Sequence, residues 1–301
     1  MPLLVTGSIG IDTVTTPFGM SENCIGGSAV YFSMAASFFA PVRLVGVVGP
    51  DCPFNLSEVF SGRDVDLRGL ERRSTSKTFR WKGSYHDTME EAITEAVQLN
   101  VLAEAPPMVP EEFKDSGHIF LANTEPRLQL QLLEQISNPS FVAADTMNFY
   151  IEGRLDNLKK LLQRIDCLVL NETEARMLSG ERNIRISAGA ILGMGPKILV
   201  IKRGRTGSLL CNSDGRMFLL SAYPANVIKD PTGAGDSFAG GFLGYIAQEQ
   251  KTDFETLKTA VAYGTVVASF TISDFSLSGL QSITRDDIEQ RLGELRQLTA
   301  F

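Results

Sequence analysis

Short apolar runs alternate with longer amphipathic stretches through the middle of the chain. The apolar runs are His118–Leu121, Phe141–Ala144, Cys167–Leu170 and Ile198–Ile201. Stretches with helical spacing separate them, at Pro126–Ile136, Gly153–Arg164 and Glu172–Leu178. Short buried strands that alternate with helices are typical of βα units, so the pattern predicts a mainly parallel sheet with helices on both faces. The run Leu3–Thr6, which ends in a glycine turn, adds a first strand.

A pattern with a period of two occupies Lys77–Leu102. Phe79, Trp81 and Tyr85 alternate with polar residues, which predicts a strand with one apolar face. The alternation resumes at Glu95–Val101 and predicts the return strand of a hairpin. An isolated hairpin is only marginally stable and must pack on another structure. It is either an edge of the main sheet or a separate lid.

Composition narrows the classes of function. The 301 residues are 44% hydrophobic and 21% charged, which is typical of a globular protein with an ample core. A net charge of −7 and a pI near 5.1 argue against a nucleic-acid scaffold or a binder of anionic membranes, since both need basic patches. Any anionic substrate must therefore be held by local groups.

The cysteines and the amino terminus bear on localisation. The four cysteines are scattered without a CxxC pair, so neither a zinc site nor a disulfide framework is indicated. Met1–Gly7 lacks a basic segment, and no apolar run reaches the ~18 residues that a bilayer span needs. We expect a cytoplasmic protein with reduced cysteines and no membrane span.

The string Asp230–Phe242, DPTGAGDSFAGGF, combines small residues with a carboxylate. Gly233, Ala234 and Gly235 permit a turn whose N–H groups point outward at the start of an apolar helix. Such a turn attracts anions, because unpaired N–H groups and the positive end of the helix dipole coincide there. At that place Asp236 either caps the helix or removes a proton from a hydroxyl that attacks phosphorus.

This string resembles the C-terminal signature of the ribokinase-like PfkB sugar and nucleoside kinases. The resemblance implies that Asp236 is the catalytic base and that Gly233, Ala234 and Gly235 form an anion hole for the transferring phosphoryl group. It also implies an α/β, ribokinase-like three-layer fold with a mainly parallel central sheet and a small β-sheet lid. We expect one domain spanning residues 1–301, with the lid formed from about residues 12–20 and 77–102.

Candidates for acceptor binding lie near the amino terminus. From the residues alone, Asp12 is equally well a solvated loop acid or a ligand after the first strand, and Gly26-Gly27 is a turn before a helix. Arg43–Asp51 resembles the family's N-terminal signature. The resemblance implies that Asp12 binds acceptor hydroxyls and that Gly26 and Gly27 lie beside the sugar. Relatives that bind ribose-like sugars often have Asn a few residues later, where this chain has Ala29-Val30-Tyr31.

Polar residues follow each of the later predicted strands. They are Asn123 and Glu125, Asp145 and Asn148, Asn171 and Glu174, and Lys202. The carboxyl ends of parallel strands meet at one edge of a sheet, so this recurrence predicts a ligand crevice there. We include Asn123 among the candidates for acceptor binding.

Two further motifs point to the nucleotide. The spacing of Asn171 and Glu174 predicts a helix-capping box, and their resemblance to the family's Asn-x-x-Glu motif implies that Glu174 orders water around Mg²⁺ on ATP. Lys202, Gly204 and Gly207 lie in a turn between two strands. By resemblance this is the ATP-contact turn, and no Walker A string occurs.

The resemblance implies an ATP- and Mg²⁺-dependent kinase that phosphorylates a hydroxyl of a small sugar or sugar-like polyol. Alternatives are a nucleoside or inositol kinase of the same fold, or a non-catalytic sugar-binding regulatory protein on this scaffold. Asp230 and Thr232 match residues that hold a monovalent cation, such as K⁺, in many relatives. We expect the acceptor and ATP as partners, without nucleic acid or membrane, and the lid is a candidate homodimer interface.

Overall fold

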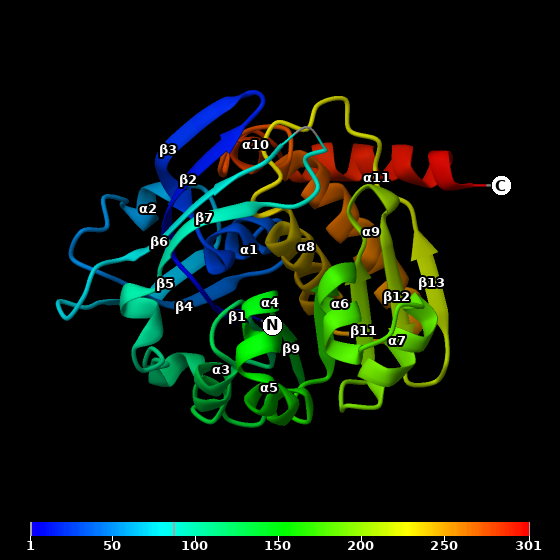
Figure 1. Ribbon diagram of the computed structural model, residues 1–301, viewed down its shortest axis with the longest axis horizontal. Helices are drawn as coiled ribbons and strands as arrows, with labels where there is room; N and C mark the ends of the chain where they lie inside the picture. The colour runs from blue at the N-terminus through cyan, green and yellow to red at the C-terminus, as the bar shows by residue number, and fades with distance from the viewer. Residues whose placement is uncertain (1, 87, 301) are drawn as a thin grey trace.

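The apolar runs of the sequence form a nine-stranded sheet in the computed structural model, which describes residues 2–86 and 88–300 (Figure 1). Met1, Asp87 and Phe301, which belong to the predicted domain, lie outside the described residues. The strand order is β13-β12-β11-β10-β9-β8-β1-β4-β5. The strands are β1 (Leu3–Thr6), β4 (Val42–Val48), β5 (Val65–Arg72), β8 (His118–Leu121), β9 (Phe141–Asp145), β10 (Cys167–Asn171), β11 (Ile198–Lys202), β12 (Ser208–Asn212) and β13 (Met217–Leu220).

The pairs from β5 through β11 are parallel, and only the β11–β12 and β12–β13 pairs at one end are antiparallel among the described strands. The predicted α/β fold with a mainly parallel sheet is therefore confirmed. Strands buried on both faces read as continuous apolar runs, which is why these were found from the sequence.

Helices cover both faces of this sheet (Figure 1). Leu3 and Val5 of β1 pack into one core, and Leu4 packs into the other, because successive side chains of a strand point to opposite faces. The first core contains residues of α1 (Ser28–Ala36), α2 (Leu56–Val59), α8 (Ala234–Glu249), α9 (Phe254–Thr271), α10 (Ser278–Gln281) and α11 (Arg285–Thr299). The second contains residues of α3 (Pro126–Leu133), α4 (Asn148–Gly153), α5 (Leu155–Leu162), α6 (Glu172–Ser179) and α7 (Ile184–Leu192).

A second sheet has four strands in the described part of the chain, in the order β3-β2-β6-β7, and we call it the lid sheet. Its strands are β2 (Gly10–Thr16), β3 (Gly19–Gly26), β6 (Phe79–Ser84) and β7 (Ile93–Gln98). Because the hairpin β6–β7 pairs with β2 and belongs to this sheet, the interpretation as an edge of the main sheet is wrong. In Figure 1 the hairpin extends from the lid sheet toward α8.

The predicted hairpin and the predicted lid segment at about residues 12–20 both need correction. The return strand is Ile93–Gln98 and not Glu95–Val101, because the chain turns into a 3₁₀ helix at Asn100–Ala103. The amino-terminal lid segment contains two strands, β2 and β3, which join at a turn with Gly19 at φ 135°. Because Gly19 is the one glycine at this turn and the residues around it have the pattern of a single extended segment, the sequence did not predict two strands.

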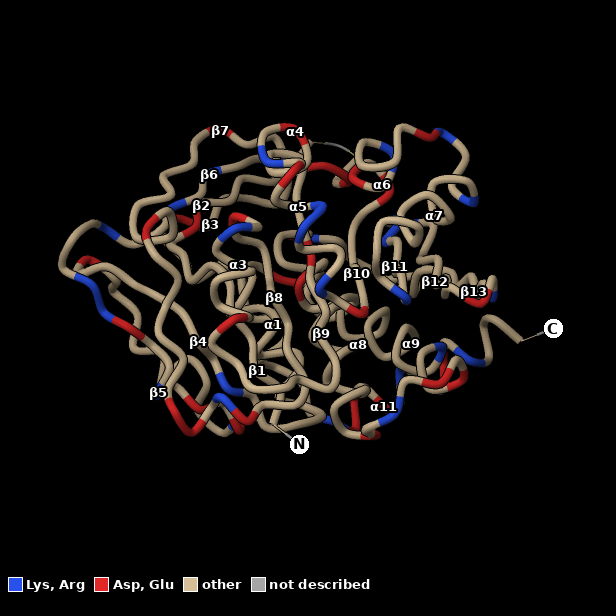
Figure 2. Tube along the Cα trace, turned by 90° about the horizontal axis from the view of Figure 1, so that it is seen from below, with Lys and Arg blue, Asp and Glu red and all other residues tan. Residues whose placement is uncertain are grey.

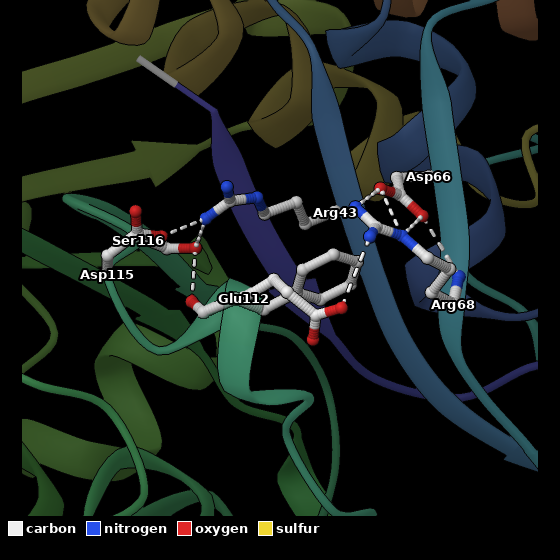
Figure 3. A network of polar contacts seen from close by, with 7 residues as sticks. Arg43, Asp66, Arg68, Glu112, Asp115 and Ser116 are labelled. Carbon is white, nitrogen blue, oxygen red and sulfur yellow. Dashed lines mark hydrogen bonds and ion pairs between the residues drawn. The ribbon is translucent and has the colours of Figure 1, made fainter.

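Two arginines brace the sheet at the amino end of β4 and β5 (Figure 3). Arg43 of β4 forms an ion pair with Asp115, and Arg68 of β5 forms one with Glu112. Both guanidinium groups lie over the Phe113 ring, at 5.1 and 5.3 Å from its centroid. These contacts tie β4 and β5 to the segment 112–115.

Charged residues of both signs are distributed along the described trace. Figure 2 shows Lys and Arg interspersed with Asp and Glu. No helix in the described ranges, residues 2–86 and 88–300, is long and apolar enough to cross a membrane.

Candidate active site

The predicted row of polar residues lies at the carboxyl ends of neighbouring strands. Asn171 ends β10 and is paired with Lys202, which ends β11. Asp145 ends β9 and is paired with Val169 of β10, two residues before Asn171. The sheet therefore brings Asp145, Asn171 and Lys202 to one edge, as the sequence predicts.

The glycine string forms the start of α8. Its N-cap is Gly233, at φ 75°, and no side chain caps the helix. Asp236 is the third residue of the helix, so the interpretation of Asp236 as the N-cap is wrong. A Cβ on Gly233 would lie 2.4 Å from ring atoms of Tyr31, whose side chain is fully buried in α1. The ring supports the turn, and the uncapped helix start is suited to an anion.

Lys202 lies directly beside this turn. Its Nζ is 2.7 Å from the position that a Cβ on Gly235 would take, so the absent side chain leaves room for the ammonium group. Burial raises the pKa of Asp236 to about 6, and Lys202 opposes the rise. At neutral pH the Asp236 carboxylate is mostly ionised and is basic enough to accept a proton.

Asp12 is buried in the lid sheet against the glycine pair. A Cβ on Gly26 would lie 1.8 Å from Asp12 Oδ2, so only glycine admits the carboxylate there. Asp12 Oδ1 is buried without a hydrogen-bond partner among the described residues. Burial raises the pKa of Asp12 to about 7, the nearby Asp230 and Asp236 carboxylates add to the rise, and the Gly27 N–H opposes it. Asp12 is thus a strand residue and not a loop acid, and it lies within electrostatic reach of Asp236.

Gly27 is the N-cap of α1, at φ 101°. A Cβ there would lie 2.4 Å from the Ser8 carbonyl oxygen, which makes glycine necessary. Ser8 and Ser28 exchange hydrogen bonds, since each backbone N–H donates to the other's hydroxyl, at 3.1 and 2.8 Å. The glycine pair therefore fixes the helix start and the position of Asp12 together.

Asp230 connects the string to the segment after α9. Its carboxylate accepts the Thr232 N–H at 2.9 Å and the Ser276 N–H at 3.3 Å. Ser276 Oγ donates to the Ile25 carbonyl at 2.6 Å. The sequence did not reveal this partner of Asp230, because residues 272–277 match no recognisable motif.

Asn171 and Glu174 form the predicted capping box of α6. Asn171 Oδ1 accepts the Glu174 N–H at 2.8 Å, and Glu174 Oε2 accepts the Asn171 N–H at 2.7 Å. Glu174 is buried, which raises its pKa, and Lys202 opposes the rise. The cap holds the carboxylate in a fixed orientation at the end of β10, and this arrangement leaves Oε1 for another partner.

The two glycines of the next turn have different surroundings. Gly207 has φ 98°, and a Cβ there would lie 1.9 Å from the Leu220 carbonyl oxygen, so glycine is a structural requirement. Gly204 has φ 53°, and no described atom lies within 4 Å of its Cβ position. Arg203 Nε donates to Glu172 at 2.8 Å and ties the turn to α6. Gly204 is the glycine that faces open space.

Comparison with known proteins gives this arrangement a family. The model of the pfkB family carbohydrate kinases matches residues 118–282, more than half of the chain. The cytidine kinase of Thermococcus kodakarensis is 32% identical over 250 residues, which cover 81% of this chain and 87% of the relative. The chain belongs to the PfkB family. It is a kinase that transfers a phosphoryl group to an alcohol.

Other relatives agree with the fold of this PfkB kinase. The nucleoside kinase of Methanothermobacter thermautotrophicus is 24% identical, with 86% of this chain and 82% of the relative covered. The structure of Burkholderia thailandensis nucleoside kinase in complex with inosine has a TM-score of 0.76 at 17% identity and covers 99% of each chain. A putative ribokinase II from E. coli, in complex with ATP and Mg²⁺, has a TM-score of 0.74 at 16% identity and covers 97% of this chain and 99% of its own.

Asn123 lies at the carboxyl end of β8, beyond Leu121. Its Nδ2 is 3.3 Å from Met147 Sδ, and its Oδ1 is buried without a hydrogen-bond partner in residues 2–86 and 88–300. A buried amide oxygen without a donor is costly, which is consistent with a site for a ligand donor in the PfkB kinase.

The sequence indicated Asp145 only as one polar residue at a strand end. In the PfkB kinase its side chain is buried, and its Oδ1 lacks a hydrogen-bond partner among the described residues. Burial raises the pKa of Asp145 well above its usual range, Asp236 adds to the rise, and Lys202 opposes it. Asp145 therefore belongs to the same electrostatic cluster as Asp236 and Lys202.

The sequence also did not reveal that Tyr85 lies beside the glycine string. Thr232 Oγ1 is 3.4 Å from the Tyr85 phenol oxygen, so a lid side chain contacts the glycine string. Burial raises the pKa of Tyr85 to about 12, and the Asp230, Asp12 and Asp236 carboxylates add to the rise. Its position in an alternating strand indicated only an apolar face.

Proposed function

We propose that this PfkB kinase phosphorylates a hydroxyl of a nucleoside with ATP. The observation that carries the proposal is the pairing of Asp12 with Trp81 across β2 and β6. Paired residues point to the same face, so a half-buried aromatic ring lies on the same face of the lid sheet as a buried carboxylate. The carboxylate suits ribose hydroxyls, and the ring face suits a stacked base.

The Trp81 ring is held in place on the lid sheet. Its Nε1 donates to Thr94 Oγ1 at 3.2 Å, and its six-membered ring covers Gly83. The names of the relatives, cytidine kinase and nucleoside kinase, support a nucleoside over the small sugar that the resemblance in the sequence implies. A sugar without a base would leave this platform unused.

On the acceptor side, we propose that Asp12 accepts hydrogen bonds from the sugar hydroxyls. Its Oδ1 is a buried acceptor without a hydrogen-bond donor among the described residues, and Gly26 and Gly27 allow the ligand to approach the backbone closely. The unpartnered Oδ1 of Asn123 supports a contact with the same ligand. The lid would be formed by residues 10–26 and 79–98.

At the transfer centre, Asp236 is proposed as the base. The carboxylate takes the proton of the attacking hydroxyl, the hydroxyl oxygen bonds to the γ-phosphorus, and the bond from that phosphorus to the β-phosphate oxygen breaks to leave ADP. The N–H groups of Gly233 and Gly235 and the Lys202 ammonium stabilise charge on the transferring group, whereas the Ala234 N–H donates to the Pro231 carbonyl at 3.1 Å and shapes the turn. When bound, Mg-ATP supplies the phosphoryl group, and its metal offsets the phosphate charge.

The residues present suit ATP and Mg²⁺. The uncapped start of α8 and the open Gly204 turn are places where phosphate and nucleotide can approach the backbone, and Gly207 shapes that turn. Glu174, oriented by its cap with Asn171, suits the water shell of Mg²⁺. We propose that Asp230 and Thr232 contribute to a K⁺ site that also stabilises the string.

The test is an ADP-release assay with Mg-ATP, with and without K⁺, on cytidine, inosine, other nucleosides, ribose, hexoses and inositol. Turnover on a nucleoside, lost about 10²- to 10⁴-fold in Asp236→Asn while ATP still binds, would support the acceptor and the base together. Turnover on ribose or a hexose alone would reject the nucleoside. Wild-type activity of Asp236→Asn would reject the base. ATP binding without any turnover would favour the regulatory alternative.

A further inference from the structure

The lid hairpin contacts the nucleotide side of the site in three places. Tyr85, just beyond β6, is anchored to β2 because its N–H donates to the Thr15 carbonyl at 2.8 Å. From there its phenol oxygen lies 3.4 Å from Thr232 Oγ1 in the string that precedes α8. A residue of the acceptor lid thus contacts the segment that carries the transfer centre.

The tip of the same hairpin reaches farther. Thr173 Oγ1, in α6, donates to Glu91 Oε1 at 3.1 Å. Arg205 Nε, in the turn between β11 and β12, is 2.7 Å from Glu90 Oε1. These contacts tie the hairpin to α6 and to the turn between β11 and β12, and Figure 1 shows the hairpin extending from the lid sheet toward α8. Tyr85 therefore lies between the anchor on β2 and the contacts of the hairpin tip.

The hydrogen bond between Thr232 and Tyr85 leaves one donor free. Thr232 Oγ1 donates to the phenol oxygen, so the phenol's own proton is not used in that contact. The Tyr85 hydroxyl lies within electrostatic reach of Asp12 on the acceptor side and of Asp236 at the start of α8. The Tyr85 phenol is thus a donor that lies beside the glycine string and within electrostatic reach of both carboxylates.

The length of the contact matters as well. An O–H···O hydrogen bond is normally 2.5–3.0 Å, so 3.4 Å describes a loose contact. Catalytic hydrogen bonds are often long without substrate and shorten in the complex. Tyr85 can therefore tighten onto the string when the lid packs on an acceptor.

We propose that Tyr85 takes part in phosphoryl transfer: through Thr232 it holds the glycine string, and its hydroxyl donates a hydrogen bond to the reacting oxygens, with its proton retained, when the lid is closed. The proposal rests on the proposed transfer centre at Asp236. It gives the lid a part in the chemical step, beyond enclosing the acceptor.

The first test is Tyr85→Phe, which removes one oxygen and keeps the ring. With Mg-ATP and the best acceptor of the panel, we expect kcat to fall about 10- to 100-fold, as for a lost hydrogen bond to a charged group, with the KM for ATP within about twofold of wild type. Tyr223→Phe is the matched control, because its hydroxyl bonds Glu294 at 2.6 Å outside the site. It should leave both constants unchanged.

The second test is a double-mutant cycle with Thr232. As a single variant, Thr232→Val should lower kcat, and in the double variant it should add little to the effect of Tyr85→Phe. Thr232→Ser, which keeps the hydroxyl, should have most of the wild-type activity. Unchanged kcat in Tyr85→Phe, an equal fall in Tyr223→Phe, or fully multiplicative effects in the cycle would each overturn the proposal. If Asp236→Asn is inactive while Tyr85→Phe is normal, the inference fails and the proposed function stands.

Discussion

Replacement of Asp12 by Asn tests whether burial of this carboxylate, which we propose binds the acceptor, lowers the free energy of unfolding. The rise in the pKa of Asp12 from 3.8 to about 7 corresponds to about 4 kcal/mol of unfolding free energy at a pH where the carboxyl is ionised in both states. The native state binds this proton more tightly than the unfolded chain. Stability therefore falls as the pH rises from about 4 to about 7, and Asp12→Asn removes that loss.

The assay is thermal unfolding of the ligand-free protein by circular dichroism at pH 5 and pH 8.5. For a chain of 301 residues, 1 kcal/mol corresponds to a shift of about 1.5 °C in Tm. The Tm of Asp12→Asn relative to wild type should rise by about 4 °C between the two pH values, because about 3 kcal/mol of the effect develops in that interval. The same variant should lose about 10- to 100-fold in kcat/KM for the acceptor.

Asp66→Asn is the control without a pH-dependent effect in this interval. A side-chain hydrogen bond from Arg68 (Figure 3) lowers the pKa of Asp66 below its usual 3.8, so this carboxyl is ionised in the folded and the unfolded state at both pH values, and the Tm difference between Asp66→Asn and wild type should be the same at pH 5 and pH 8.5, with activity unchanged. A difference in Tm between Asp12→Asn and wild type that is the same at both pH values would refute the reasoning. It would mean that the carboxyl is solvated and not buried beside Gly26.

Further perturbations address the geometry of the site. In a pH–rate profile, the kcat/KM for the acceptor should fall below about pH 7 and more steeply below about pH 6. The reason is that Asp12, with a pKa of about 7, and Asp236, with a pKa of about 6, must both be ionised. A profile that stays flat down to pH 5 would contradict this prediction. Gly26→Ala should lower acceptor kcat/KM about 100-fold in steady-state kinetics, since the new Cβ displaces a carboxylate oxygen now 1.8 Å from its position. Glu90→Arg and Arg205→Glu should each raise the acceptor KM about two- to fivefold, and the double exchange should restore it; no rescue would argue against the ion pair.

The sequence predicted the central sheet well for a physical reason. Strands buried on both faces must be apolar throughout, and the residues at their ends are free to be polar, so both the runs and residues such as Asp145 and Lys202 stand out. The start of α8 can also be predicted from a short segment, because a turn of small residues with outward-pointing N–H groups depends only on its own backbone. In these parts one segment carries the whole signal.

The lid and the support of the site depend on contacts between distant segments. Tyr31 is an apolar helix residue in sequence, and only the fold shows that Gly233 rests on its ring. Gly207 reads as part of a nucleotide turn, yet a carbonyl of β13 is what excludes a side chain there. Tyr85 and Thr232 are 147 positions apart, so no local pattern relates them. Pairings of this kind are set by topology and not by periodicity.

The buried acids link the stability of the ligand-free enzyme to ligand binding. The Asp230 and Asp236 carboxylates raise the pKa of the buried Asp12, and Lys202 is the cation that opposes the rise in the pKa of Asp236. A ligand-free enzyme therefore holds its active carboxylates at a cost in stability, and any cation or hydroxyl that binds them returns part of that cost as affinity. The contact from Tyr85 to Thr232 is long, at 3.4 Å, whereas the contacts of Glu90 and Glu91 at the tip are 2.7 and 3.1 Å. The tip therefore holds the hairpin in place, and the Tyr85 contact is the one that a bound substrate can shorten.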